Sequence, residues 1–432
     1  MFFVAHQCFP RCMPVDFSLL HPALPPLPGV DDSDVVVTGL GMSTPQGGDV
    51  DSTWTALLAG TSGVRVLDEP WADQLPVRIG APLKEEPELD RVSRRRMDRC
   101  QQLAVVVARQ AWADAGKPDV DPTRLAVVFG TGLGGGATLV DQYERCRELG
   151  PDRVSPFTVT MLMPNGPAAV VSMDLGARGG AHAPTSACAS GAEAIALGSA
   201  LIRRNVADVV VAGGTEACLG RLSIAAFARM GALSRKHSSP DSASRPFDAN
   251  RDGFVMAEGA GAVVLERGSY ARSRGVRGYA RLAGTGMSSD AHDMTAPSPV
   301  GQIQAIHQAV RSAGLSGYDV SHINAHAPGT PVGDRVEASA ILDAIGPHPL
   351  VTATKSVTGH LIGGAGAVEA IFTVLALHHG VVPATRNLDE LDPEVKLDIV
   401  TGTPRKARIV SALSNSFGFG GHNVVLAFTR AT

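Results

Sequence analysis

Hydrophobic and polar positions form two alternating patterns along most of this chain. Short apolar runs rich in β-branched residues end at or near glycine, and amphipathic stretches with helical spacing lie between them. In the first half, the predicted strands cover 35–39, 125–130, 208–214 and 261–266, and the predicted helices include 100–115 and 190–203. Because these runs are apolar on both faces, we expect parallel strands covered by helices on each side. Such alternation is typical of an α/β fold.

The same alternation begins again after about Gly284. Here the predicted strands cover 323–327, 350–354, 397–400 and 423–428, and the predicted helices cover 300–313, 334–344 and 366–379. The segments 190–201 and 366–377 are identical at five of twelve positions, which supports an internal repeat. We therefore predict two related halves, 34–284 and 285–432.

Residues 1–33 differ from the rest of the chain in composition. Prolines crowd the segment 21–29, and the acidic segment 31–34 leads into the first predicted strand. We predict that residues 1–33 are a disordered N-terminal extension outside the fold.

Composition and charge restrict the class of protein. The 432 residues are 44% hydrophobic and only 19% charged, which predicts a large core and argues against a disordered chain. The net charge of −4 provides no electrostatic attraction to nucleic acid or to an anionic membrane. No apolar run reaches the ~18 residues of a membrane span, since the richest stretch, 367–384, contains Glu369, His378 and His379. The six cysteines form no CxxC pair, and the apolar N-terminus lacks a basic signal-peptide region, so we expect a reducing cytoplasmic location.

A glycine-rich loop at 130–135 matches the dinucleotide-binding pattern GxGxxG. It follows a predicted strand and precedes a predicted helix at 137–149, and Glu148 or Asp152 lies near the expected place of a ribose-binding acid. The fingerprint normally opens the first βα unit, whereas this loop follows about ninety residues of fold. A NAD-dependent oxidoreductase is therefore a minor alternative.

Cys188 lies at a strand-to-helix turn, in the sequence PTSACASG at 184–191. The unpaired N–H groups and the positive end of the helix dipole favour a thiolate there and lower the pKa of the thiol. Ala187, Ala189 and Gly191 allow a substrate to approach closely. A small buried thiol that only packs is the alternative, and the residue types leave both interpretations open.

Two histidines occupy similar positions in the second half. His326 ends one predicted strand before the turn at Pro328 and Gly329, and His360 follows another strand in the sequence KSVTGH. Strand ends meet at one edge of an α/β sheet, where such folds place their sites. Each histidine alone is more simply structural, but together with Cys188 they indicate a shared site. A metal site is the weaker alternative, because no carboxylate lies at ligand spacing.

The segment 415–422, with the sequence NSFGFGGH, is a glycine-rich loop between two apolar runs. Its flexible glycines could carry Phe417 or Phe419 over a pocket as a gate. A plain β-hairpin turn is an equally good interpretation.

Together these motifs resemble those of the β-ketoacyl-ACP synthases, which are elongating condensing enzymes. The resemblance covers about residues 35 to 428, and the matching segments in family order are VVVTGLG, TSACASGAEA, RPFDANRDGFVMAEGAG, NAHAPGTPVGD, KSVTGH and SNSFGFGGHN. It implies a five-layer αβαβα thiolase-like α/β fold of two related halves and a decarboxylative Claisen condensation with malonyl-ACP. It also implies a homodimer that acts on acyl carrier protein and needs no cofactor or metal. MPNGPAA at 163–169 and His422 are most similar to the actinobacterial branch that extends meromycolate chains.

The resemblance also implies a role for each matching residue. Cys188 would be the acylated nucleophile, with its own N–H and that of Phe419 as the oxyanion hole. His326 and His360 would hydrogen-bond the malonyl carbonyl and stabilise the enolate. The supporting residues would be Lys355, Glu369, Asp334, Glu337 and Asn415, of which Lys355 and Glu369 form a charged pair and Asp334 and Glu337 orient the His326 loop. The substrate contacts would be Phe419 as a gate, Phe417, Leu133 and Phe227 along the acyl pocket, and Thr330 at the phosphopantetheine arm.

One motif departs from the family pattern His-Gly-Thr-x-Thr-Pro. Ala327 and Pro328 replace the glycine and the first threonine, whereas Thr330 and Pro331 remain. In relatives both threonine hydroxyls contact the phosphopantetheine arm, so one contact is in doubt while the histidine chemistry is not.

The residue types suit a condensation better than the alternatives. Thioester exchange needs a thiolate nucleophile, and the loss of CO2 needs hydrogen-bond donors at the enolate oxygen, which two neutral imidazoles provide. A cysteine hydrolase would need one histidine and a route for water. A non-catalytic chain-length subunit usually lacks the cysteine, so Cys188 with both histidines favours the enzyme.

Overall fold

The computed structural model describes residues 34–276 and 278–431, and the extension predicted at 1–33 lies outside the described residues. Strands of the first half lie side by side in the order β5-β4-β6-β7-β1. Their bounds are Val35–Ser43 (β1), Leu125–Gly130 (β4), Ala181–His182 (β5), Val209–Glu216 (β6) and Gly259–Arg267 (β7). The strands predicted from apolar runs in this half are thus confirmed, with β1 longer than expected.

The direction of these strands differs in part from the prediction. Every residue of β6 and β7 is buried, as expected for strands covered on both faces. β4 runs parallel to β5 and β6, but β7 runs antiparallel to both β6 and β1. The expectation of parallel strands throughout was wrong, because an apolar run indicates only that both faces of a strand are covered. It does not indicate whether the neighbouring strands run parallel or antiparallel to it. The long connection at 217–258 allows β7 to return antiparallel to β6.

Strands of the second half follow in the order β12-β10-β9-β14-β15-β8. Their bounds are Ala280–Ser289 (β8), His322–Asn324 (β9), Leu350–Thr352 (β10), Asp398–Ile399 (β12), Ser411–Gly418 (β14) and His422–Arg430 (β15). β9 runs parallel to β10 and β14, whereas β15 runs antiparallel to β14 and β8. The two groups join through β1 and β8, which pair at Val36–Arg281 and Val37–Ala280.

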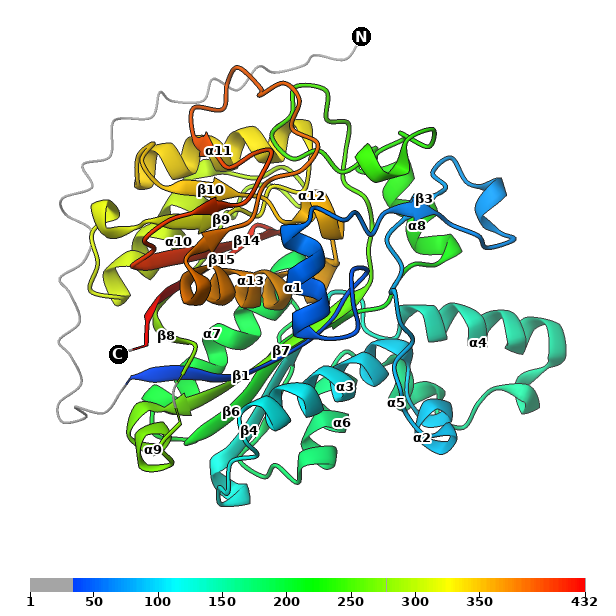
Figure 1. Ribbon diagram of the computed structural model, residues 1–432. Helices are drawn as coiled ribbons and strands as arrows, with labels where there is room; N and C mark the ends of the chain where they lie inside the picture. Colours follow the sequence, from blue (N-terminus) through cyan, green and yellow to red (C-terminus); the bar gives the residue numbers. More distant parts are fainter. Residues whose placement is uncertain (1–33, 277, 432) are drawn as a thin grey trace, which may run out of the picture. The chain divides into compact units, whose positions relative to one another are not determined.

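Helices and strands stack in five layers (Figure 1). α3 (Arg99–Asp114) and α6 (Gly166–Leu175) cover the outer face of the first strand group, and α10 (Pro299–Ser312) with α11 (Pro331–Ala344) covers the second. α7 (Ser190–Arg203) and α13 (Ala365–His379) lie between the groups and contact strands of both. Apolar clusters fill the spaces between the layers. The predicted αβαβα architecture is confirmed.

The two central helices are the segments in which the internal match was found. α7 and α13 pack against each other, and residues 365–377 of α13 are all buried. The stretch Ile362–His379 is long and apolar enough to cross a membrane, but 89% of it is buried inside the fold. It is therefore a core helix, and its apolar character comes from contact with strands on both sides.

Shorter elements connect these layers. They include the helices α1 (Val50–Leu58), α2 (Arg91–Arg96), α4 (Gly136–Leu149), α5 (Thr158–Leu162), α8 (Arg221–Arg229), α9 (Gly268–Ser273) and α12 (Lys355–Thr358), and the strands β2 (Arg65–Val66), β3 (Ile79–Gly80), β11 (Val381–Val382) and β13 (Arg405–Lys406). The predicted boundary between the halves, 284/285, falls inside β8 and remains a prediction. β8 was not predicted from the sequence. Its residues alternate between buried and partly exposed positions around two glycines, so it lacks the continuous apolar run by which the other strands were recognised.

Candidate active site

A cavity of about 580 Å³ opens beside the turn that precedes α7. Its lining contains most of the residues that the sequence assigned to a site, namely Cys188, His326, His360, Glu337, Phe227, Phe417, Phe419 and Thr330, and also Pro328. Leu133 is not among the described residues that line the cavity, and its side chain is 43% exposed. The structure therefore brings the predicted nucleophile and both histidines into one pocket but leaves Leu133 outside it.

The turn around Cys188 has an unusual backbone held by hydrogen bonds. Cys188 lies in the single-turn helix η5 (Ala187–Ala189), directly before α7, and Ala187 has a positive φ of 49°. Residues with a Cβ rarely adopt this conformation. The Ser190 hydroxyl accepts from the Ser186 N–H at 3.0 Å and donates to the Ala187 carbonyl at 2.7 Å. These bonds hold the strained turn that presents the thiol to the cavity.

The environment of the Cys188 thiol contradicts one prediction. Burial raises the pKa of Cys188 to about 11, although the charge of Lys355 and the backbone N–H of Phe419 act in the opposite direction. The lowered pKa expected from the helix start was therefore wrong, because removing the thiolate from water outweighs the favourable groups around it. The sulfur lies 3.0 Å from Nε2 of His360, which is placed to accept the thiol proton.

This pKa predicts how Cys188 reacts with alkylating agents. The thiolate is the reactive form, so alkylation by iodoacetamide is expected to accelerate about tenfold per pH unit from about pH 6 to about pH 10 without levelling off. Peptide-resolved mass spectrometry after short pulses measures the rate. Free cysteine, whose thiol pKa is about 8.5, provides the comparison that does level off. A plateau for Cys188 below pH 8 would show that the helix start dominates after all.

His326 and His360 are both buried and lie close together. Their ring centroids are 5.3 Å apart, and the rings are nearly perpendicular at 82°. Burial lowers the pKa of each histidine well below 6.5, and the positive charge of Lys355 lowers it further. Both imidazoles are therefore neutral near pH 7, and each can offer one N–H group without protonating a carbanion.

Lys355 decides which nitrogen of His326 carries the proton. Its ammonium contacts Nδ1 of His326 at 3.3 Å, the His326 carbonyl at 2.6 Å and the Glu369 carboxylate. An ammonium can only donate, so Nδ1 of His326 must accept and Nε2 must hold the hydrogen. The buried pair Lys355 and Glu369 thus fixes a tautomer in which Nε2–H is the free donor of His326.

Two carboxylates from α11 hold the loop that carries His326. Glu337 accepts hydrogen bonds from the N–H groups of His326 (2.8 Å) and Ala327 (2.6 Å) and from the Asn415 amide (3.0 Å). Because these N–H groups bind a side chain instead of a strand, the predicted strand 323–327 ends early, at residue 324.

Asp334 holds the next part of the same loop. It accepts from the N–H groups of Gly329 and Thr330, both at 3.1 Å, and from that of Phe247 at 2.9 Å. The positions of both α11 carboxylates agree with the loop-orienting role that the resemblance implies.

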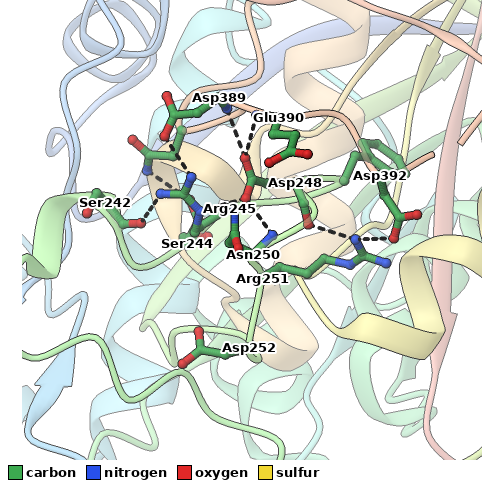
Figure 2. A network of polar contacts seen from close by, with 12 residues as sticks. Ser242, Ser244, Arg245, Asp248, Asn250, Arg251, Asp252, Asp389, Glu390 and Asp392 are labelled. Atoms are coloured by element: carbon green, nitrogen blue, oxygen red, sulfur yellow. Dashed lines mark hydrogen bonds and ion pairs between the residues drawn. The ribbon is translucent and has the colours of Figure 1, made fainter. Parts of the chain in front are cut away.

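A polar network around Arg245, Asp248 and Arg251 contacts this loop, and Figure 2 shows the network. Arg251 donates to Asp392 at 2.7 Å, to the Thr330 carbonyl at 3.0 Å and to the Pro331 carbonyl at 2.7 Å. Asp248 accepts from Arg245 at 3.0 Å and from the backbone N–H groups of residues 389 and 390. The segment RPFDANRDGFVMAEGAG therefore fixes the cavity wall at 330–331, a role that sequence reasoning did not assign.

The N–H groups of the GxGxxG loop bind a carboxylate of this chain instead of a dinucleotide. Its N–H groups at Gly132 (2.8 Å) and Leu133 (3.3 Å) donate to the carboxylate of Glu216, the last residue of β6. An internal carboxylate thus occupies the donors that would hold a pyrophosphate, which overturns the dinucleotide-binding alternative. Sequence reasoning missed Glu216, although a charged residue closing the apolar run VVVAGGTE was a possible signal.

The glycine-rich segment at 415–422 is a β-hairpin that also reaches the cavity. β14 and β15 pair from Ser411–Thr429 to Gly418–His422, so the turn consists of residues 419–421, in which both glycines have positive φ. The Phe419 ring stacks on Phe227 with centroids 6.5 Å apart, and its backbone N–H contacts the Cys188 sulfur. The hairpin interpretation is confirmed, and its turn brings an aromatic ring and an N–H donor to the thiol.

The comparisons with known proteins agree with this geometry. The family model described as "Beta-ketoacyl synthase, N-terminal domain" matches residues 32–271, and the model "Beta-ketoacyl synthase, C-terminal domain" matches residues 279–389. The chain belongs to the beta-ketoacyl synthase family. The 3-oxoacyl-[acyl-carrier-protein] synthase 2 of Mycobacterium bovis is 46% identical over 404 residues, which are 92% of this chain and 97% of that protein.

Solved structures of this beta-ketoacyl synthase family superpose closely. A beta-ketoacyl synthase from Burkholderia phymatum has a TM-score of 0.87 and 33% identity, and the match covers 92% of this chain and 100% of the other. The ketosynthase of the AntDE:AntF complex, a type II PKS acyl-carrier protein with its ketosynthase, has a TM-score of 0.86 and 29% identity over 92% and 99% of the two chains. The protein is thus a 3-oxoacyl-ACP synthase, a condensing acyltransferase of fatty-acid elongation.

Proposed function

We propose that Cys188, His326 and His360 carry out a decarboxylative condensation between an acyl chain and malonyl-ACP. The observation that supports this most directly is the contact of 3.0 Å between the Cys188 sulfur and the His360 imidazole, inside a cavity that His326 also lines. The two neutral histidines and the backbone N–H groups at the thiol provide donors of the kind that both chemical steps need.

In the first step, the Cys188 sulfur attacks the thioester carbonyl of acyl-ACP. The thiol proton moves to Nε2 of His360, the nearest basic atom, since burial keeps the free thiol protonated at neutral pH. The N–H groups of Cys188 and Phe419, which both contact the sulfur, stabilise the oxyanion of the tetrahedral intermediate. The bond to the phosphopantetheine sulfur then breaks, and that thiol leaves with the proton.

In the second step, malonyl-ACP enters and loses CO2. The bond to the carboxylate breaks and leaves its electron pair on the remaining two-carbon unit as an enolate. The Nε2–H of His326, which the Lys355 contact at Nδ1 fixes, donates to the enolate oxygen. His360 also donates from Nε2, in the tautomer that carries the hydrogen there once Cys188 is acylated and no longer offers it a thiol proton. The enolate carbon attacks the acyl carbonyl on Cys188, and the new C–C bond forms. The Cys188 sulfur leaves as a thiolate, which then takes up one proton from solvent because its pKa is raised.

Further parts of the proposal concern partners and location. Acyl carrier protein would deliver both substrates, in keeping with the family and with the ketosynthase in the AntDE:AntF complex. A homodimer would cover large apolar side chains that are exposed along 133–173, namely Leu133, Leu139, Tyr143, Leu149, Val159 and Met173. A reducing cytoplasm suits Cys100, Cys146, Cys188 and Cys218, which are free thiols.

The most specific part of the proposal concerns the biosynthetic pathway. The motif at 163–169, His422 and the 46% identity to the mycobacterial relative favour the branch that extends long meromycolate chains. Incubation with acyl-ACPs of graded length, followed by intact-mass spectrometry, tests the nucleophile and the chain preference together. Acylation of Cys188 that is fastest with long chains supports the meromycolate branch, and a preference for short chains contradicts it. Absence of an adduct contradicts the proposed reaction.

Pro328 leads to a prediction about substrate affinity. It lines the cavity where relatives carry threonine, and proline provides neither a hydroxyl nor an N–H group. One neutral hydrogen bond contributes ~0.5–1.5 kcal/mol, or roughly a factor of 2 to 13 in affinity. Pro328→Thr is therefore expected to lower KM for malonyl-ACP a few-fold and to leave kcat nearly unchanged, because the arm is held similarly in the ground and transition states.

A matched variant provides the control for this experiment. Thr330→Val removes the remaining hydroxyl of the motif and should raise KM, again with little change in kcat. If Pro328→Thr instead lowers kcat at constant KM, Pro328 stiffens the His326 loop and the pantetheine argument is wrong.

A further inference from the structure

The buried carboxylate of Glu216 connects turns that belong to the two halves of the fold. Glu216 is fully buried at the end of β6 and accepts hydrogen bonds from the Thr131 hydroxyl (3.0 Å) and the Gly132 N–H (2.8 Å) in the first half. It also accepts from the Gly363 N–H (3.2 Å) in the second half. Gly363 belongs to the single-turn helix η8 (Ile362–Gly364), which begins two residues after His360.

Two turns that contact this carboxylate or its loop are strained. Ala187, directly before Cys188, and Ile362, two residues after His360, have positive φ values of 49° and 47°. This conformation is unfavourable for any residue with a Cβ and most of all for a β-branched one, so surrounding contacts must maintain it. Such strain is found where the fold holds a particular local geometry against the preference of the chain.

Glu216 is linked directly to the turn at Ile362, through the Gly363 N–H, and indirectly to the turn at Ala187, through Thr131 and Ser190. The Ser190 hydroxyl lies 2.7 Å from the Ala187 carbonyl and 3.3 Å from the Thr131 carbonyl, so the loop around Glu216 contacts the nucleophile turn. On the other side, a Cβ built on Gly363 would lie 2.3 Å from the Gly132 nitrogen and 2.9 Å from Glu216 Oε2. The two loops therefore approach as closely as glycine allows, with the carboxylate between their N–H groups.

We propose that Glu216 is a positioning residue that sets the contact between Cys188 and His360 by holding the two strained turns together. The inference rests on the roles proposed above for Cys188 and His360. Burial raises the pKa of Glu216 to about 7, so the carboxylate is negatively charged above that pH. There its charge lies near the thiol and contributes to the raised pKa of Cys188. Glu216 thus affects the geometry of the reacting pair and the charge around it.

Glu216→Gln tests this proposal at nearly constant side-chain volume. The amide NH2 of glutamine cannot accept from backbone N–H groups, so the turns should lose part of their support. We expect kcat for condensation to fall by up to about 10²-fold, the scale of a 1 Å misplacement, with KM for malonyl-ACP nearly unchanged. Removal of a like charge should also shift the pH profile of Cys188 alkylation to lower pH. Glu266→Gln, an equally buried glutamate at the other end of the same sheet, is the matched control and should retain wild-type kinetics.

The outcomes separate this proposal from the proposed function. If wild-type protein shows no acyl adduct on Cys188, the proposed function fails; if it does and Glu216→Gln behaves as wild type, the positioning role alone is overturned. Alkylation of the buried thiols Cys100 and Cys218 in the variant would show that its core has opened. In that case two variants of Thr131, whose hydroxyl donates to Glu216, test the role. A lower kcat for Thr131→Val together with a recovered kcat for Thr131→Ser supports the positioning role. Equal kcat values for the two variants overturn it.

Discussion

Replacing Cys188 with alanine is expected to abolish both the acyl adduct and condensation. The variant retains the cavity, the histidines and the backbone N–H groups at 188 and 419, but it has no atom to which the acyl group can be transferred. Intact-mass spectrometry after incubation with acyl-ACP measures the adduct, and release of 14CO2 from labelled malonyl-ACP measures decarboxylation. Because the donors at the enolate oxygen remain, decarboxylation of malonyl-ACP should continue in the alanine variant.

Cys146→Ala is the matched control for this experiment, since Cys146 is a free and exposed cysteine. It should acylate at the wild-type rate. An alanine variant at 188 that still gains acyl mass at that rate would show that another residue is the nucleophile.

Removing the imidazole of His326 is expected to separate the two chemical steps. His326→Ala should still form the acyl enzyme, because the thiol contacts His360 and not His326. Decarboxylation should fall by roughly 10²–10³-fold, the usual effect of losing one preorganised donor at a developing oxyanion. Single-turnover measurements of adduct formation and of CO2 release give the two rates separately.

His307→Ala serves as the control, because His307 is exposed on α10, away from the cavity. Its two rates should equal those of the wild type. Loss of acylation in His326→Ala together with intact decarboxylation would reverse the assigned roles.

The fold could be predicted from the sequence wherever local burial controls the pattern. β4 and α7 begin and end at the predicted residues, since an apolar strand that ends in glycine and an amphipathic helix are encoded over a few neighbouring positions. The match between 190–201 and 366–377 correctly indicated the paired central helices, because both segments meet the same packing demands between two sheets. The antiparallel course of β7 could not be predicted, because strand direction depends on partners that are distant in the chain.

The residue types of the site could be predicted from the sequence, but the burial and hydrogen-bond partners of those residues could not. Cys188 and His360 are separated by 172 positions, yet small residues around each of them and their places at element ends indicated a shared site. The direction of the thiol pKa was predicted wrongly, because the helix start is visible in the sequence and the depth of burial is not. Glu216 was missed for a similar reason, since its donors come from loops in both halves.

By itself the sequence therefore predicted most of the strands and helices in their order, the repeated α/β pattern, and the cysteine and two histidines that the fold brings into one cavity. These follow from interactions between near neighbours in the chain and from the intrinsic chemistry of thiol and imidazole. Tertiary structure alone decided the strand directions, the raised pKa of the Cys188 thiol, the tautomer of His326 and the carboxylate that occupies the GxGxxG loop. Each of these depends on desolvation or on hydrogen bonds between segments far apart in sequence, which become defined only when the two halves pack together.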